Sequence, residues 1–176
     1  KYLDMYNNVA GVGHCNPAVV NAVTEQMKTL NTHTRYLHEK ILDYSEELLA
    51  LMPDEINKIM YMCTGSEAND LALRVAEAYT GGTGIIITQE AYHGTSALTS
   101  GCSPSLGAGQ PLLPNVRLIT APDYYRHGGT PEEFTAWYAS EMQKTIDDLN
   151  EAGYKFSCFL ADSIFSSDGI YPDPVG

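Results

Sequence analysis

Residues 61–73 read YMCTGSEANDLAL and mark a change in the character of the chain. An apolar run typical of a strand, KIMYMC at 58–63, ends here, and the small residues Thr, Gly and Ser follow at 64–66. A pattern with helical spacing then begins and continues to Tyr79, before two glycines end it. We therefore predict a strand, a short turn and a helix in direct succession.

The small residues in front of this helix are typical of an anion site. The first amide hydrogens of a helix have no intrahelical partner, and that end carries about half an elementary charge. Gly65 would let an anion approach the backbone without a Cβ in the way, and Ser66 would add a hydroxyl. The alternative is an ordinary N-cap with a tight turn, which spacing alone favours because Ser and Thr caps are common.

Strand and helix patterns alternate along the rest of the chain. GIIIT at 84–88, NVRLIT at 115–120 and FSCFLAD at 156–162 are strand-like, and β-branched runs of this kind are typical of buried parallel strands. TPEE at 130–133 is a capping box that would open a helix closed by Gly153. The order predicts an α/β domain with a mostly parallel sheet.

Two amphipathic helices are predicted ahead of this alternating region. Asn16 and Pro17 resemble an N-cap followed by proline at the first helical position. A second helical pattern occupies residues 38–52, where a proline ends it. We assign residues 1–55 to an N-terminal helical segment and residues 56–176 to the first part of a larger α/β domain.

Three predicted loops would share one edge of the sheet, because ligands of parallel sheets bind beyond the carboxyl ends of the strands. These loops start at Thr64, Gln89 and Asp162. In the loop that starts at Gln89, Tyr92 and His93 would stack an aromatic ring on a flat ligand ring. A single Tyr–His pair, however, more often belongs to a packed or surface loop without a ligand. An Asp at the end of a strand, such as Asp162, is more often a solvated or capping carboxylate than part of a binding site. An anion site, an aromatic and an acid on successive strand ends together favour a binding site.

Several stretches resemble a known family. TGSEANDLALRVAEAYTG, ITQEAYHG and ADSIFSSDGIYPDP are similar to the large domain of class III pyridoxal-phosphate-dependent aminotransferases, which have fold type I. YLDMYNNVAGVGHCNPAVVNAV also matches, and LNTHTRYLH resembles the subgroup that contains alanine–glyoxylate-aminotransferase-like enzymes and ethanolamine-phosphate phospho-lyase. The resemblance covers almost the whole chain. It implies a three-layer α/β/α large domain that is incomplete here, an N-terminal fragment without the later strands and the C-terminal small domain.

The resemblance implies that five residues bind pyridoxal 5′-phosphate. Gly65 and Ser66 would bind the cofactor phosphate together with the following helix N-terminus. Tyr92 would stack on the pyridine ring, and His93 would lie beside it. Asp162 occupies a position where most relatives have Glu, near the cofactor, and its side chain is one methylene shorter.

The resemblance also implies what the chain lacks. The family's pyridine-nitrogen aspartate and Schiff-base lysine follow the segment that ends at Gly176, and no lysine of this chain occupies a matching context. We therefore expect no catalytic residue here and a fragment that is inactive by itself. The intact parent would transfer an amino group from an amino donor to a 2-oxo acid by a Schiff-base ping-pong mechanism.

Two other functions stay open at this point. A phospho-lyase with the same cofactor, acting on a phosphorylated amino alcohol, is the nearest alternative. A non-catalytic binding or assembly module belongs to a different class. The resemblance further implies a homodimer that takes small-molecule substrates.

Composition excludes other classes of function. The 176 residues carry a net charge of −12, and the ten basic residues are scattered, which argues against a nucleic-acid binder. No apolar run is long enough to span a bilayer, so we expect no membrane partner. The histidines show no metal-ligand spacing, so we predict no metal site and keep a zinc hydrolase only as an alternative.

The four cysteines indicate a reducing compartment. None are paired at zinc-motif spacing, and Cys63 and Cys158 lie in apolar strand-like runs. We expect the cysteines to be reduced and mostly buried, which favours a cytoplasmic protein.

Overall fold

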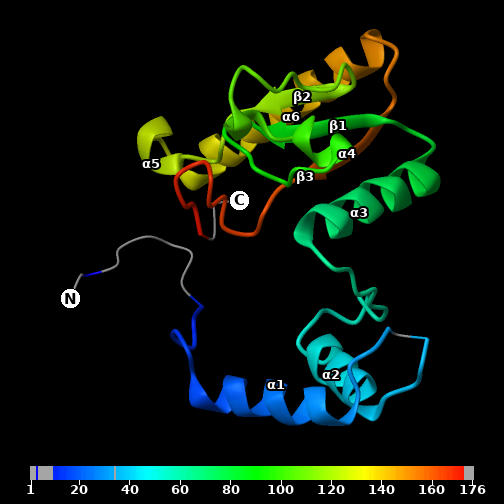
Figure 1. The fold of residues 1–176 in the computed structure, drawn as a ribbon. Coiled ribbons are helices and arrows are strands. Elements are labelled where there is room, and N and C mark those ends of the chain that lie inside the picture. The colour runs from blue at the N-terminus through cyan, green and yellow to red at the C-terminus, as the bar shows by residue number, and fades with distance from the viewer. Residues whose placement is uncertain (1–2, 4–9, 34, 173–176) are drawn as a thin grey trace. The chain divides into compact units, whose positions relative to one another are not determined.

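The structure, a computed structural model, describes residue 3, residues 10–33 and residues 35–172. It contains two compact units, Lys1–Ile59 and Met60–Gly176 (Figure 1). The assignment of residues 1–55 and 56–176 to parts of a larger domain stays a prediction.

The first unit contains both predicted helices. In α1 (Pro17–Thr29) the Asn16 side chain accepts a hydrogen bond from the Ala18 amide at 2.9 Å, which confirms the predicted N-cap. Helix α2 (Glu39–Leu49) ends three residues before the predicted boundary, since the chain turns at Ala50. Within the described part of the chain neither helix has a buried residue.

The second unit is built on the predicted parallel sheet. Its strands are β1 (Gly84–Thr88), β2 (Val116–Ile119) and β3 (Phe156–Leu160), in the spatial order β2-β1-β3. Both pairings are parallel, and all five residues of the central strand β1 are buried. The carboxyl ends of the three strands therefore meet at one edge.

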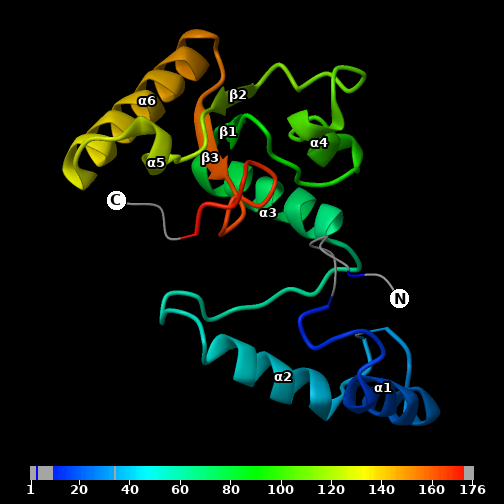
Figure 2. The ribbon, with the colours of Figure 1, turned by 90° about the vertical axis from the view of Figure 1, so that its left-hand side faces the viewer.

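Helices cover both faces of this sheet (Figures 1 and 2). Helices α3 (Gly65–Thr80) and α4 (Ala97–Ser100) lie on one face, and α6 (Pro131–Glu151) lies on the other. Successive side chains of β1 point to opposite faces, so they divide between two apolar clusters. The α3 side contains Leu73, Ile85, Ile87, Ala91, Cys102 and Val116, and the α6 side contains Ile86, Ile119 and Leu149.

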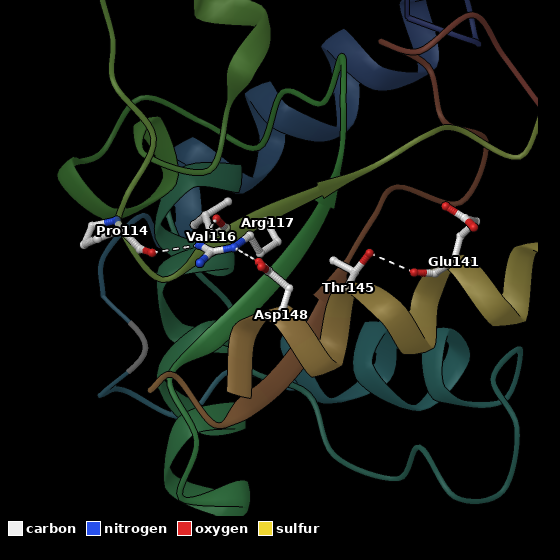
Figure 3. Close-up of polar contacts among 6 residues, drawn as sticks. All are labelled: Pro114, Val116, Arg117, Glu141, Thr145 and Asp148. Carbon is white, nitrogen blue, oxygen red and sulfur yellow. Dashed lines mark hydrogen bonds and ion pairs between the residues drawn. The ribbon is translucent and has the colours of Figure 1, made fainter. Parts of the chain in front are cut away.

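The predicted capping box opens α6. The Glu133 amide donates to Thr130 Oγ1 at 3.2 Å, and the Thr130 amide donates to Glu133 Oε2 at 2.8 Å. Further along the helix, Asp148 pairs with Arg117 of β2, as Figure 3 shows. The Arg117 guanidinium also donates to the carbonyl oxygens of Pro114 and Val116, each at 3.0 Å. The ion pair of Arg117 with Asp148 attaches α6 to β2 at a partly exposed position.

The connections contain three short helical turns. Helix α4 and the 3-10 helix η1 (Pro104–Leu106) lie between β1 and β2, and α5 (Tyr124–His127) precedes α6. Among the helices that the structure describes, none combines the length and apolar character needed to cross a bilayer.

The predicted strand at 58–63 is wrong. Residues 56–62 form neither helix nor strand, and the side chains of Met60 and Met62 are 69% and 43% exposed. A strand needs a neighbour that completes its hydrogen bonds, and none of the three described strands pairs with this run. Apolar character alone does not supply that neighbour.

The expected burial of the cysteines is wrong for two of them. All four are free, but Cys15 and Cys63 are exposed, and only Cys102 is buried, with Cys158 half-buried. Cys63 is exposed because the run it ends has no sheet to pack on. The buried Cys102 packs in the cluster on the α3 side of the sheet.

Candidate functional site

The turn before α3 is both a helix cap and an open surface. Thr64 Oγ1 accepts a hydrogen bond from the Glu67 amide at 3.1 Å, and Glu67 Oε2 accepts one from the Cys63 amide at 3.0 Å. Thr64 is therefore the N-cap, as the simpler interpretation of the sequence proposed. Gly65 nevertheless faces open space, because a Cβ added there would have no atom within 4 Å. The first turn of the helix thus remains accessible to a ligand.

One face of α3 holds the loop that follows β1. Ser66 Oγ accepts a hydrogen bond from the Thr95 amide at 3.1 Å, and Asn69 Nδ2 donates to the His93 carbonyl at 2.8 Å. One residue further, Asp70 accepts a hydrogen bond from Ser96 Oγ at 2.7 Å. Residues three and four apart share a helix face. Ser66, Asn69 and Asp70 therefore all bind the same short segment of the loop.

Gly94 allows this close approach. It has a φ of +137°, and a Cβ there would lie 2.4 Å from Ser66 Oγ and 2.6 Å from Thr99 Oγ1. A side chain at this position would therefore push the loop away from α3.

Tyr92 and His93 have opposite exposures. Tyr92 is 49% exposed, so its ring can contact a ligand, whereas His93 is 7% exposed. The His93 amide donates to Ser103 Oγ at 2.8 Å, and its Nε2 has no hydrogen-bond partner among the described residues. Burial lowers the pKa of His93, and the nearby carboxylates of Asp162 and Asp168 and a hydrogen bond with the Leu160 backbone oppose this shift. The effect of burial is the larger one, so the surroundings of His93 favour the neutral imidazole.

Asp162 caps the turn that follows β3. Its carboxylate accepts hydrogen bonds from the Ile164 amide at 3.0 Å, from the Ser166 amide at 3.0 and 3.1 Å, and from Ser166 Oγ at 3.1 Å. The capping interpretation of this residue is therefore confirmed. Its charge still acts on His93, which places the two side chains in one region.

Asp168 is the residue that sequence reasoning missed. Its Oδ2 accepts a hydrogen bond from Thr88 Oγ1 at 2.7 Å, and its Oδ1 accepts one from the Glu90 amide at 3.0 Å. Thr88 is the last residue of β1, so this carboxylate joins the loops after β1 and β3. An aspartate before glycine in a polar stretch resembles any turn, and nothing in its spacing indicates a partner about eighty residues away.

The structure brings the three predicted loops together. Ser66 connects the turn at Thr64 to the loop that starts at Gln89, and Asp168 connects that loop to the one that starts at Asp162. No group of three or more His, Cys, Asp or Glu side chains suited to a metal occurs in the part of the chain that the structure describes.

Comparisons with known proteins agree with the family resemblance. A family model described as aminotransferase class-III matches residues 1–173. The chain is 33% identical over its full length to an alanine–glyoxylate aminotransferase 2-like protein of Drosophila melanogaster and covers 37% of that protein. It is 30% identical to ethanolamine-phosphate phospho-lyase homolog 1 of Caenorhabditis elegans, over 96% of the chain and 39% of that protein.

Solved structures share the fold. A phospholyase from Arthrobacter in complex with phosphoethanolamine matches 98% of this chain with a TM-score of 0.86 and 36% identity, over 41% of its own chain. A PMP-bound aminotransferase from Vibrio fluvialis matches 93% of this chain with a TM-score of 0.73 and 26% identity, over 38% of its own chain. The chain spans less than half of each relative. It belongs to the class III aminotransferase family, and its parallel sheet with flanking helices is part of the fold type I domain of that family.

Proposed function

We propose that this chain forms the phosphate- and ring-binding part of a pyridoxal-phosphate site in a class III enzyme. The family uses this cofactor. One observation carries the proposal: the Ser66–Thr95 contact holds the Tyr92 loop against the N-terminus of α3. This contact joins the first turn of α3 to the loop that carries the exposed Tyr92, as binding of a phosphorylated flat ring would require.

The residues present fit the phosphate group. The open space over Gly65 admits an anion to the first amides of α3, where the helix dipole favours negative charge. Ser66 Oγ accepts the Thr95 hydrogen bond, so its own O–H is left to donate to a phosphate oxygen. The first amides of α3 and the Ser66 hydroxyl would together hold the phosphate.

The residues also fit the ring. Tyr92 presents a half-exposed aromatic face that would stack on the cofactor. His93, the next residue of the loop, is buried, and burial lowers the pKa of its imidazole, so it would add little positive charge near the ring. When bound, pyridoxal phosphate supplies an electron sink that stabilises a carbanion on the substrate. The role of this chain would be to bind and orient that group.

Amino transfer from an amino donor to a 2-oxo acid is the first reaction we propose for the natural protein that contains this chain. The proposal includes an amino donor and an oxo acid as small-molecule substrates and a homodimer as the assembly. The similarity to the Drosophila melanogaster aminotransferase 2-like protein supports it.

Phosphate elimination from a phosphorylated amino alcohol is the second candidate, and a specific observation favours it. The Arthrobacter phospholyase exceeds the Vibrio fluvialis aminotransferase in both identity and TM-score against this chain, 36% and 0.86 against 26% and 0.73. The two reactions differ in one product, because only the elimination releases inorganic phosphate.

The test uses the natural protein with added pyridoxal phosphate. It should acquire a visible absorbance band that borohydride removes. Alanine with glyoxylate and phosphoethanolamine alone are then offered separately, while pyruvate and inorganic phosphate are measured. Pyruvate from the first mixture supports amino transfer, and phosphate from the second supports elimination. A protein that carries no cofactor and gains none on incubation would refute both reactions.

A further inference from the structure

We propose that Asp168 is a positioning residue, which fixes the loop that carries Tyr92 by joining the end of β1 to the loop after β3. Its effect on a bound cofactor rests on the proposed function, but its effect on the loop does not.

Asp168 uses both oxygens of its carboxylate in this contact. One accepts the hydroxyl hydrogen of Thr88 at 2.7 Å, and the other accepts the Glu90 amide at 3.0 Å. Thr88 is only 1% exposed, so its hydroxyl has little access to water and depends on this partner. Hydrogen bonds to a charged acceptor are stronger than those between neutral groups.

The segment that holds Asp168 is itself fixed at several points. Asp162 caps its first turn, and the Tyr171 amide donates to the Ile164 carbonyl at 2.8 Å. Phe165 and Ile170 have φ values of +51° and +66°, which non-glycine residues rarely adopt. Such backbone persists only where surrounding contacts determine it, so the segment offers Asp168 from a defined position.

The loop that carries Tyr92 is consequently held on both sides. On one side Glu90 is bound by Asp168, and on the other Thr95 is bound by Ser66. Only four residues, 91–94, separate these two anchors, and Tyr92 is the exposed aromatic among them. If the first anchor is lost, the loop keeps its contacts with α3 and the hydrogen bond from the His93 amide to Ser103 Oγ, but it loses its hold on the β1 side of Tyr92.

The experiment compares variants of the natural protein without cofactor by hydrogen–deuterium exchange. Asp168→Ala should raise the exchange rate of the Glu90 amide about tenfold or more, the factor expected on loss of a hydrogen bond to a charged acceptor. Residues 91–94 should also exchange faster. Thr88→Val keeps the shape of its side chain and should raise exchange less, because the Glu90 contact remains.

Controls separate positioning from general destabilisation. Asp168→Asn keeps one acceptor oxygen and should restore part of the protection, while Asp147→Asn, on the exposed side of α6, should change nothing. Wild-type exchange of residues 89–94 in Asp168→Ala would overturn the inference. Equal acceleration throughout the sheet in both Asp168→Ala and Thr88→Val would also overturn it, because the effect would then be global.

A second measurement addresses the cofactor. With pyridoxal phosphate added, Asp168→Ala should reduce the visible circular dichroism of the bound cofactor and weaken its affinity, with Asp168→Asn between it and the wild type. Unchanged dichroism and affinity beside accelerated exchange would overturn the role in cofactor positioning. If the wild-type protein binds no pyridoxal phosphate, the proposed function fails, whereas the exchange data still decide whether Asp168 holds the loop.

Discussion

Two apolar runs have different structures in this molecule. GIIIT at 84–88 forms the central strand β1, buried along its whole length between two parallel neighbours. KIMYMC at 58–63 forms no strand, and its methionines at 60 and 62 are exposed. Both runs contain residues that favour extended backbone, Ile in the first and Ile and Tyr in the second. A strand therefore forms only where neighbouring strands complete its hydrogen bonds. The sequence of the run does not determine whether such neighbours are present.

The largest expected effect on stability is that of truncating a side chain in the buried run, compared with the same change in the exposed run. Ile86→Ala should lower the free energy of unfolding of this chain by about 2–5 kcal/mol, because it removes a fully buried side chain and leaves a cavity. Met60→Ala should change it by no more than about 0.5 kcal/mol, as for an exposed residue. Urea denaturation of both variants measures the two values. Similar losses would break the comparison and show that the run at 58–63 is packed.

A smaller effect is expected where the chain leaves β1. Gly94→Ala should lower stability by about 1–3 kcal/mol, because it adds backbone strain at a φ of +137° and a contact of 2.4 Å with Ser66 Oγ. Gly109→Ala is the matched control, since a Cβ there meets nothing within 4 Å. Thermal unfolding of both variants tests this. A Gly94→Ala variant as stable as its control would mean that the loop does not rest on α3.

The pH dependence of stability should reflect the burial of His93. Its folded pKa lies below the ordinary value of 6.5, so the unfolded chain binds the proton more readily. Stability should therefore be fully present above about pH 6.5 and should fall as the pH drops from there through the lower folded pKa. His93→Gln should flatten this dependence, as denaturant titrations between pH 5 and 8 would reveal. An unchanged slope in His93→Gln would place the titration elsewhere.

Thiol labelling tests the packing without any substitution, because Cys63 ends the unpaired run and Cys102 packs in the cluster beside β1. Cys63 ends the unpaired run and is exposed, as is Cys15, so both should react quickly with a maleimide. Burial raises the pKa of Cys102 to about 11, and that thiol should react only on unfolding. Mass spectrometry after brief labelling at neutral pH gives the sites. Rapid modification of Cys102, or protection of Cys63, would contradict the described packing.

Local signals were sufficient for most of the fold. The capping box at Thr130 and the N-cap at Asn16 each form through neighbours in sequence. Parallel pairing followed from the alternation of strands and helices. The lack of a strand at 58–63 could not be predicted, because strand pairing is a long-range property. Helix α5 could not be predicted either, because a single helical turn has no periodic pattern.

Some residues of the candidate site could also be predicted from local patterns, and one could not. Gly65, Ser66, Tyr92, His93 and Asp162 were identified because each follows a strand-like run, and the structure brings their loops together. Their roles toward a cofactor stay predictions. Asp168 was missed because its partners, Thr88 and Glu90, lie about eighty residues away, and no local pattern indicates them.

The central claim is that the open turn at the start of α3 receives the phosphate of the cofactor. Titration of the natural protein and two glycine variants with pyridoxal phosphate tests it most directly, because a Cβ added at either glycine meets no atom within 4 Å. Gly65→Val should weaken cofactor affinity at least about tenfold by blocking the helix N-terminus, whereas Gly109→Val should leave it at the wild-type value. Equal affinity in the two variants would contradict the account.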